Sequence, residues 1–170
     1  MRLRYRLHQF FGGLLARVSE ADRLAADAVL PAGARAWFRS LPADLQWHGL
    51  QVMRDLQANG VARAEVLAAA LLHDAGKAEA SSGPIQRGLI VLARRLAPDW
   101  LARRSGADWR TARGLDRVAA VAAQHPRIAA ERAAQCGCAP LTVELIRRHQ
   151  DQSAGGDPVL TLFQQVDDRH

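Results

Sequence analysis

The segment LLHDAGK at residues 71–77 sets a histidine beside an aspartate at the end of an apolar run. Burying a carboxylate among leucines and alanines is costly unless it is protonated, paired with a cation or bound to a metal ion. Because the neighbouring side chain is an imidazole, a metal ion is the simplest partner. The segment therefore predicts that His73 and Asp74 are metal ligands.

Lys77 follows this aspartate by three residues and is the single lysine in a chain with 23 Lys and Arg residues in all. The compact ammonium of lysine and the planar guanidinium of arginine are not interchangeable. A site that places an ammonium beside Asp74 would explain why this position carries lysine. The alternative is that the one lysine has no special role.

Two further histidines continue apolar helical stripes, which face the core of a protein. His48 follows Leu45 by three residues and precedes Val52 by four, while His149 follows Leu145 by four. Either histidine alone would more commonly be a hydrogen-bonded core residue. Both are predicted to point inward.

His125 and Asp167 complete the set of candidate ligands. The residue before a proline is pushed out of the α-helical region, and proline suits a first helical position, so His125 is expected at a junction between two helices. Asp167 continues the apolar stripe of Leu160, whereas Asp168 lies on the more polar side. Asp167 is therefore the carboxylate expected to face inward.

Imidazoles and carboxylates together form a mixed nitrogen and oxygen ligand set that suits divalent metals. The expected cofactor is one or two ions of Mn, Fe, Co, Ni, Zn or Mg per chain. The predicted ligands are His48, His73, Asp74, His125, His149 and Asp167.

Helices must position these side chains, because no segment alternates apolar and polar residues for long enough to predict a strand. The fold is expected to be all-α and a single compact domain, since 170 residues with 49% hydrophobic content suffice for one core. Residues 42–170 should form the metal-binding domain, and residues 1–41 an N-terminal helical extension of it. Glycines, prolines and caps predict helices over 20–30, 42–58, 63–75 (ended by Gly76), 85–101, 111–124, 126–136, 140–150 and 158–170.

Composition restricts the partners. A net charge of +6 favours anionic ones, but aromatic and basic residues are not interleaved as in single-stranded nucleic-acid grooves, so nucleic acid is not the expected partner. No apolar run approaches the roughly 18 residues that cross a bilayer, and residues 2–17 lack a clear signal-peptide cleavage site, so a cytoplasmic location is expected. Cys136 and Cys138 lie too close for an ordinary disulfide and are expected to be structural thiols.

A basic amphipathic insert is expected at about 84–113, between the His-Asp pair and His125. Leucines and arginines alternate along its residues 85–105. Three interpretations are open: a lid that selects anionic substrates, a peripheral helix on an anionic membrane surface, or an ordinary helix packed on the core.

In their order along the chain, the six predicted ligands resemble the HD superfamily of metal-dependent phosphohydrolases. LLHDAGK is similar to the HDIG-type signature of that family, and HPRIAAE at 125–131 is similar to the His-Pro-x-x-Gly-Ala stretch of its two-metal members. The resemblance covers roughly residue 45 to the C-terminus.

The resemblance implies a hydrolase that cleaves a phosphomonoester or phosphodiester, with a nucleotide-like small molecule as substrate, by means of metal-activated water. Asp74 would orient that water and Lys77 would contact the phosphate. The implied ligands are His48, His73, Asp74 and Asp167 for one ion and His125 and His149 for a second, with Asp74 bridging the two.

Departures from the family pattern keep two alternatives open. Arg148 stands where a first histidine of a doublet is common, and Ala129 stands where glycine is common, which weakens the second metal position. Both favour a degenerate HD domain that binds a phosphorylated ligand or a partner without turnover. The other alternative is a di-iron oxygenase, since a few HD-fold proteins use the same ligands for oxygen chemistry. Residues 156–158 read Gly-Asp-Pro where cyclic-di-GMP phosphodiesterases carry Gly-Tyr-Pro, so that substrate is not assigned.

Overall fold

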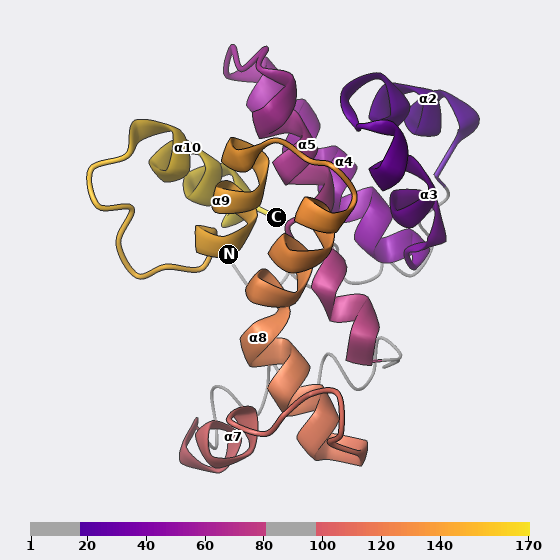
Figure 1. Cartoon of the computed structure of the whole chain (residues 1–170). Helices are drawn as coiled ribbons and strands as arrows, with labels where there is room; N and C mark the ends of the chain where they lie inside the picture. Colours follow the sequence, from indigo (N-terminus) through magenta and orange to yellow (C-terminus); the bar gives the residue numbers. More distant parts are fainter. Residues whose placement is uncertain (1–17, 81–97) are drawn as a thin grey trace.

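The computed structural model describes residues 18–80 and 98–170. Every regular element within these ranges is helical, and the predicted all-α fold is confirmed (Figure 1). The elements are α2 (Glu20–Val29), α3 (Ala32–Ser40), α4 (Ala43–Ala58), α5 (Ala64–Leu72), the 3₁₀ helix η1 (Ala75–Ala80), α7 (Pro98–Ser105), α8 (Gly114–Gln135), α9 (Pro140–Arg148) and α10 (Pro158–Asp167).

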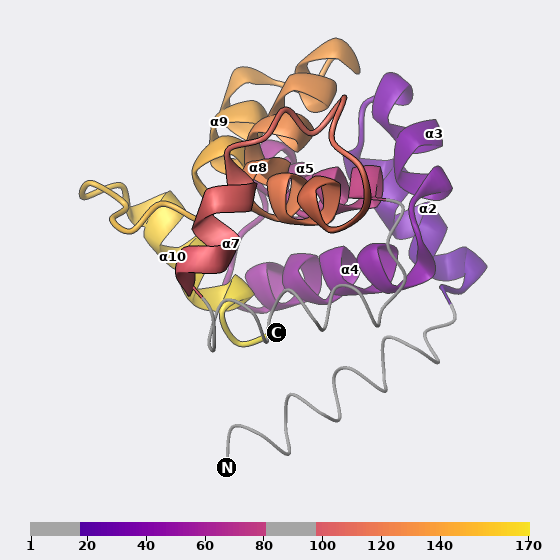
Figure 2. The same ribbon diagram turned by 90° about the horizontal axis from the view of Figure 1, so that it is seen from below.

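Helix α5 lies at the centre of the described fold because its sequence is wholly apolar after Glu65. Every residue from Val66 to Leu72 is buried, and each larger aliphatic side chain contributes about 1.5–3 kcal/mol when it leaves water. Helices α2, α4 and α9 pack around α5, and Figure 2 shows α4 running alongside it. The C-terminal end of α5 therefore delivers His73 into the interior.

The N-terminal helices α2 and α3 contribute to the same hydrophobic core. Ala26, Trp37 and Phe38 are buried in one cluster with Leu50 of α4 and Leu72 of α5. Within the described residues, the segment before Pro42 is thus packed on the helices that carry the predicted ligands.

Two glycines let backbones approach each other next to the predicted ligands. A Cβ on Gly49 of α4 would lie 2.8 Å from the carbonyl oxygen of Leu71 in α5. A Cβ on Gly76 of η1 would lie 2.3 Å from the carbonyl oxygen of His125 in α8. Since real Cβ atoms do not approach so closely, glycine is required at both contacts. These contacts bring α4, α5 and α8 together around the His-Asp pair.

The prediction that Gly76 ends the helix carrying His73 and Asp74 is wrong. Helix α5 ends at Leu72, His73 is its C-cap residue, and Gly76 lies inside η1. Gly76 does not have a positive φ, so it does not act as a left-handed helix stop. Its role is the close contact with the backbone of His125.

The prediction of a helix junction at His125 is also wrong, because α8 runs unbroken through Pro126. Proline has no backbone N–H and cannot donate to the carbonyl four residues earlier, which normally weakens a helix interior. Here the Nδ1 atom of His125 lies 2.9 Å from that carbonyl, the oxygen of Ala122, and replaces the missing donor. The histidine side chain thus supports the helix at the proline.

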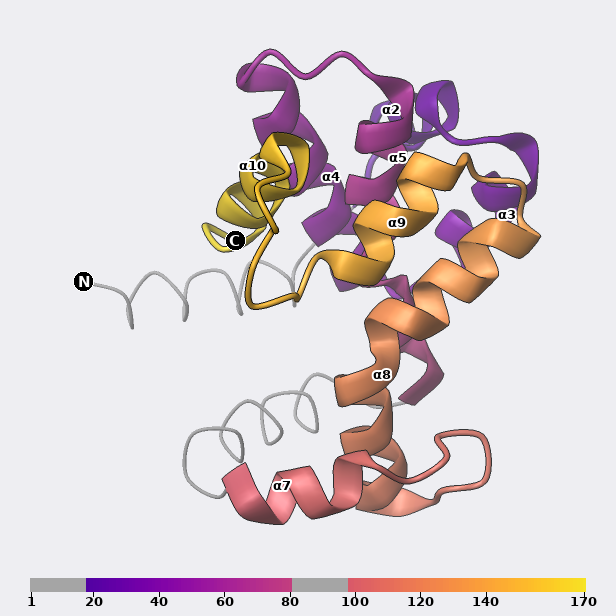
Figure 3. The ribbon, with the colours of Figure 1, turned by 60° about the vertical axis from the view of Figure 1, so that its left-hand side comes forward.

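Helix α7 packs against the N-terminal part of α8, at the end of α8 remote from α9, as Figure 3 shows. The rest of the predicted basic insert, residues 84–97, lies outside the described residues, as does the segment 2–17. The interpretations of the insert as a lid, a membrane-surface helix or a packed helix therefore stay predictions. Among the described residues, no helix combines the length and apolar character needed to cross a membrane.

Candidate metal centre

Three buried histidines are oriented in the same way. Each directs its Nδ1 atom to the backbone carbonyl three residues earlier, and a carbonyl oxygen can only accept a hydrogen bond. Their Nδ1 atoms therefore carry hydrogen, and their Nε2 atoms face the interior as potential ligands. The pairs are His73 with Ala70 at 2.9 Å, His125 with Ala122 at 2.9 Å and His149 with Ile146 at 2.7 Å.

The Oδ1 atom of Asp74 lies among these three imidazoles. It is 3.2 Å from Nε2 of His125, 3.7 Å from Nε2 of His149 and 3.8 Å from Nε2 of His73. The Nε2 atoms of His125 and His149 are buried and have no hydrogen-bond partner. With hydrogen on Nδ1, each presents a lone pair toward a carboxylate oxygen, and two acceptors so close repel each other. A cation between them would remove this repulsion.

A second group of predicted ligands lies on the solvent side. The Oδ1 atom of Asp167 is 3.1 Å from Nε2 of both His48 and His73, and the two Nε2 atoms are 3.2 Å apart. The side chains of His48 and Asp167 are each 21% exposed, against 1% for His73. We call His125, His149 and Asp74 Oδ1 the inner half, and His48, His73, Asp167 and Asp74 Oδ2 the outer half.

The separations between these atoms suit metal coordination. With metal–nitrogen bonds of about 2.1 Å, neighbouring ligand atoms lie about 3.0 Å apart in octahedral and about 3.4 Å apart in tetrahedral geometry. Three trios have ligand atoms within 4.8 Å of one another: His48, His73 and Asp74; His73, His149 and Asp167; and Asp74, His125 and His149. The residues present therefore fit a divalent metal ion, and all six predicted ligands converge.

Helix direction would also favour a cation at the centre. His73 and His149 are the C-cap residues of α5 and α9, and Asp167 is the last residue of α10. The C-terminal end of a helix carries a partial negative charge, which stabilises a nearby cation. Three helices thus direct this charge to one point.

The charge states of the ligands follow from their surroundings. Burial lowers the pKa of His125 to about 4, so its ring is neutral. Burial opposes a charge on His73, but the carboxylates of Asp167 and Asp74 raise its pKa to about 9. Burial likewise opposes the charge on Asp74, yet the Lys77 ammonium and His73 hold its pKa well below the usual range. Without metal the centre therefore contains ionised carboxylates and a proton on His73, which a metal ion would displace.

Lys77 lies at the solvent side of the centre. Its Nζ atom is 2.5 Å from Asp74 Oδ2, and its side chain is 32% exposed. The backbone N–H of Lys77 donates to the carbonyl of Asp74 at 2.9 Å, within the turn that begins η1. This turn places the ammonium on the oxygen opposite to the one that faces the inner half.

Sequence analysis missed one histidine next to the centre. The Nε2 atom of His170 lies 2.8 Å from Asp55 Oδ2, and its ring centroid is 6.3 Å from that of His48. The available signal was its position three residues after Asp167, one helical turn onward.

Arg148 and Asp157 are two of the positions at which the sequence departs from the HD pattern that it resembles, and both have local structural roles. Arg148 directs its Nε atom to Asp151 Oδ2 at 3.1 Å and its guanidinium to the carbonyl of Ala154, so it forms contacts with the following loop. Asp157 caps α10, accepting from the backbone N–H groups of Val159 and Leu160.

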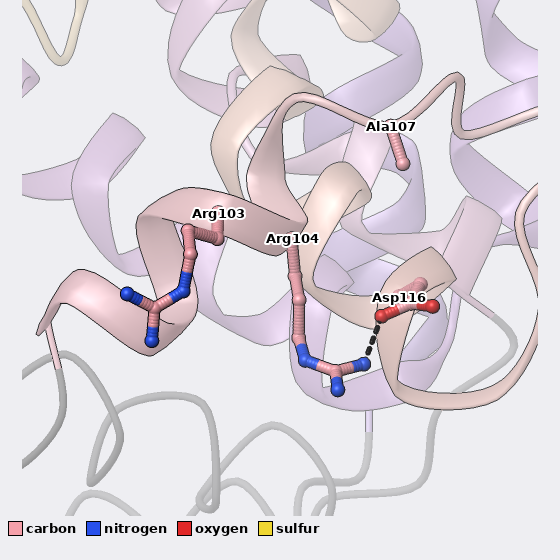
Figure 4. A pocket seen from close by; sticks show the side chains of 4 residues that line it. All are labelled: Arg103, Arg104, Ala107 and Asp116. Carbon is pink, nitrogen blue, oxygen red and sulfur yellow. Dashed lines mark hydrogen bonds and ion pairs between the residues drawn. The ribbon is translucent and has the colours of Figure 1, made fainter.

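A surface pocket of about 360 Å³ lies elsewhere, lined by Arg103, Arg104, Ala107 and Asp116 (Figure 4). Arg104 and Asp116 form an ion pair within this lining. Asp116 precedes His125 by nine residues, roughly 13 Å along α8. This pocket is therefore separate from the histidines and holds none of the predicted ligands.

Neither protein-family models nor curated proteins nor solved structures give a match to the chain. The chemistry open to the centre follows from its predicted ligands, their charges and their access to solvent.

Proposed function

We propose that the chain is an HD-type metal-dependent phosphohydrolase that cleaves a phosphomonoester or phosphodiester, with a nucleotide-like molecule as substrate. The observation that carries the proposal is the pair of buried, unpartnered Nε2 atoms of His125 and His149 facing Asp74 Oδ1. Such atoms are costly without a ligand. The order of the six ligands along the chain supports the HD assignment.

The charges of the centre favour an anionic substrate. The carboxylates of Asp74 and Asp167 balance one divalent ion, and the ammonium of Lys77 adds positive charge at the exposed side. A second ion would add more. A phosphoryl group that approaches from this side meets His48, Asp167 and Lys77 first, because these partly exposed side chains are the least buried of the centre.

Each protein group has a role in this proposal. Bound divalent ions would supply Lewis acidity toward phosphoryl oxygens and a water activated for attack on phosphorus. Asp74 presents one oxygen to each half of the centre and is suited to orient that water. Lys77 is suited to contact the phosphate and to stabilise charge that develops on it.

Metal stoichiometry tests the proposal. Protein purified without chelators and without a nickel column should contain about two divalent ions per chain, and His125→Ala should contain about one. His170→Ala is the matched control, because it removes a histidine beside the centre that is bonded to Asp55, and it should keep both ions. Wild-type protein without any ion would contradict the proposal. Activity would then be measured on phosphomonoesters and phosphodiesters with the metals found.

The histidine-rich ligand set also favours a second candidate, a di-iron oxygenase. Four imidazoles and two carboxylates suit iron as well as manganese or zinc. Iron as the resident metal, with oxygen uptake and no phosphoester hydrolysis, would support the oxygenase. Metal and phosphate binding with neither activity would support the degenerate binding domain.

A further inference from the structure

The two oxygens of Asp74 have different surroundings. Oδ1 faces the imidazoles of the inner half, whereas Oδ2 lies 3.6 Å from Nε2 of His48 and 2.5 Å from Nζ of Lys77. The oxygen that Asp74 would offer to an ion in the outer half is therefore already held by a cation.

An ammonium and a divalent ion on the same oxygen repel each other. The Asp74 side chain is only 11% exposed, so little solvent screens this repulsion at its carboxylate. The polar atoms of the outer half also have partners without metal, since Asp167 Oδ1 lies 3.1 Å from the Nε2 atoms of both His48 and His73. An ion that enters the outer half must replace these contacts and is repelled by the Lys77 ammonium. The inner half, by contrast, has two buried Nε2 atoms, of His125 and His149, without a hydrogen-bond partner.

The ammonium of Lys77 can move away from Asp74 toward solvent. Its side chain is 32% exposed, and lysine carries its charge on a flexible four-carbon stem. An anion at the mouth of the centre would offer Nζ a second negative partner. The movement needs only rotation of the side chain, since the backbone of η1 can stay in contact with α8 through Gly76.

We propose that Lys77 and the outer metal ion compete for Asp74 Oδ2, and that an anionic phosphate group relieves the competition by drawing the ammonium away from the carboxylate. This inference rests on the metal centre of the proposed function. Because such coupling is reciprocal, phosphate tightens the outer ion and the outer ion tightens phosphate by the same factor.

Manganese binding tests the competition. Metal-free wild type, Lys77→Met and Lys77→Arg would be titrated with Mn²⁺ by calorimetry, with and without inorganic phosphate, and His48→Ala would identify the outer ion as the one lost. Lys77→Met should bind the outer ion about tenfold more tightly than wild type, and phosphate should tighten it further in wild type than in Lys77→Met. Lys77→Arg keeps the charge and should not reproduce the tightening. Arg23→Met, which removes an exposed charge on α2, should leave both ions unchanged.

The single lysine of the chain allows a direct measurement. Lysine labelled with ¹⁵N at Nζ gives one side-chain NMR signal, which reports on Lys77 alone. The signal should be that of an ammonium hydrogen-bonded to a carboxylate in the metal-free protein. It should change when the second equivalent of Zn²⁺ binds, and a first equivalent should change it less.

The outcomes separate this inference from the proposed function. Equal outer-ion affinities in wild type and Lys77→Met, with equal effects of phosphate, would overturn the competition and leave the two-ion centre standing. One ion per chain in every variant would overturn it too, because no outer ion would then exist. No ion in any variant would overturn the proposed function and this inference together.

Discussion

The inner and outer halves of the centre share Asp74 but differ in how far protein contacts alone pair their polar atoms. The inner Nε2 atoms of His125 and His149 are buried without partners, whereas His48 and Asp167 in the outer half are partly exposed and bonded to each other. An unpaired buried acceptor costs about 1–3 kcal/mol. The inner half is therefore the stronger indication of a bound metal ion, even though the outer half contains more atoms that could coordinate one.

The largest effect is expected from Gly76→Ala, which acts on the inner half. Its Cβ would lie 2.3 Å from the carbonyl oxygen of His125, and neither backbone can yield without moving Asp74 away from the inner histidines. We expect a loss of about 3 kcal/mol in the free energy of unfolding, at the upper end for overpacking, and weaker binding of the inner ion. Urea denaturation and metal analysis measure the two effects.

Two other glycines sharpen this test. Gly49→Ala meets Leu71 at 2.8 Å and should cost less, acting on the outer half through His48. Gly106 has open space around it and no positive φ, so Gly106→Ala should be nearly neutral. Equal stability of the Gly76 and Gly106 variants would show that the contact between η1 and α8 is not tight in solution.

Metal addition should produce the next largest effect. An ion that binds only the folded chain stabilises it by about 2.7 kcal/mol at one hundred times its dissociation constant. Thermal unfolding of metal-free protein should therefore shift upward with Mn²⁺, and EDTA should reverse the shift. In His125→Ala the shift should shrink because the inner half has lost a ligand. A shift of the same size in this variant would mean that the ion resides wholly in the outer half.

Arg117→Met should have a smaller effect, and it tests how firmly η1 holds Lys77 in place. The guanidinium of Arg117 donates to the carbonyl of Glu79 at 3.0 and 2.8 Å and to the carbonyl of Trp109 at 2.9 Å. Removing it should lower the free energy of unfolding by about 1.5 kcal/mol, since hydrogen bonds of charged donors are the stronger ones. Chemical denaturation would measure the free energy of unfolding of this variant and of the control Arg113→Met, which changes an exposed arginine four residues earlier. Identical curves would show that Arg117 does not hold η1.

The inward direction of the predicted ligands could be read from the sequence because it depends on local periodicity. His48 and His149 lie on apolar stripes, and the apolar run of α5 must end in the core, so the convergence of these residues follows from helical geometry. The all-α class follows in the same way from the absence of alternation.

The local backbone could not be predicted where a distant element decides it. Gly76 looks like a helix stop, yet it is glycine because α8 passes within van der Waals contact, about fifty residues later in the chain. Pro126 looks like a helix start, yet the side chain of His125 supplies the donor that the proline lacks. Both glycine and proline can have two structural roles, and the contacts that the residue makes in the folded chain decide which role it has.

The smallest effect is expected from Arg148→His, which introduces a histidine where the resemblance to the HD pattern would place one. Arg148 contacts Asp151 and Ala154 rather than the ligands, and its side chain is 29% exposed, so loss of these surface contacts should cost less than about 1 kcal/mol. A histidine pointing the same way should not reach an ion, and the metal content should stay as in wild type. An additional ion in this variant would mean that the end of α9 can rotate toward the centre. The arginine would then be what keeps the inner half to two imidazoles, and the degenerate binding domain would gain support.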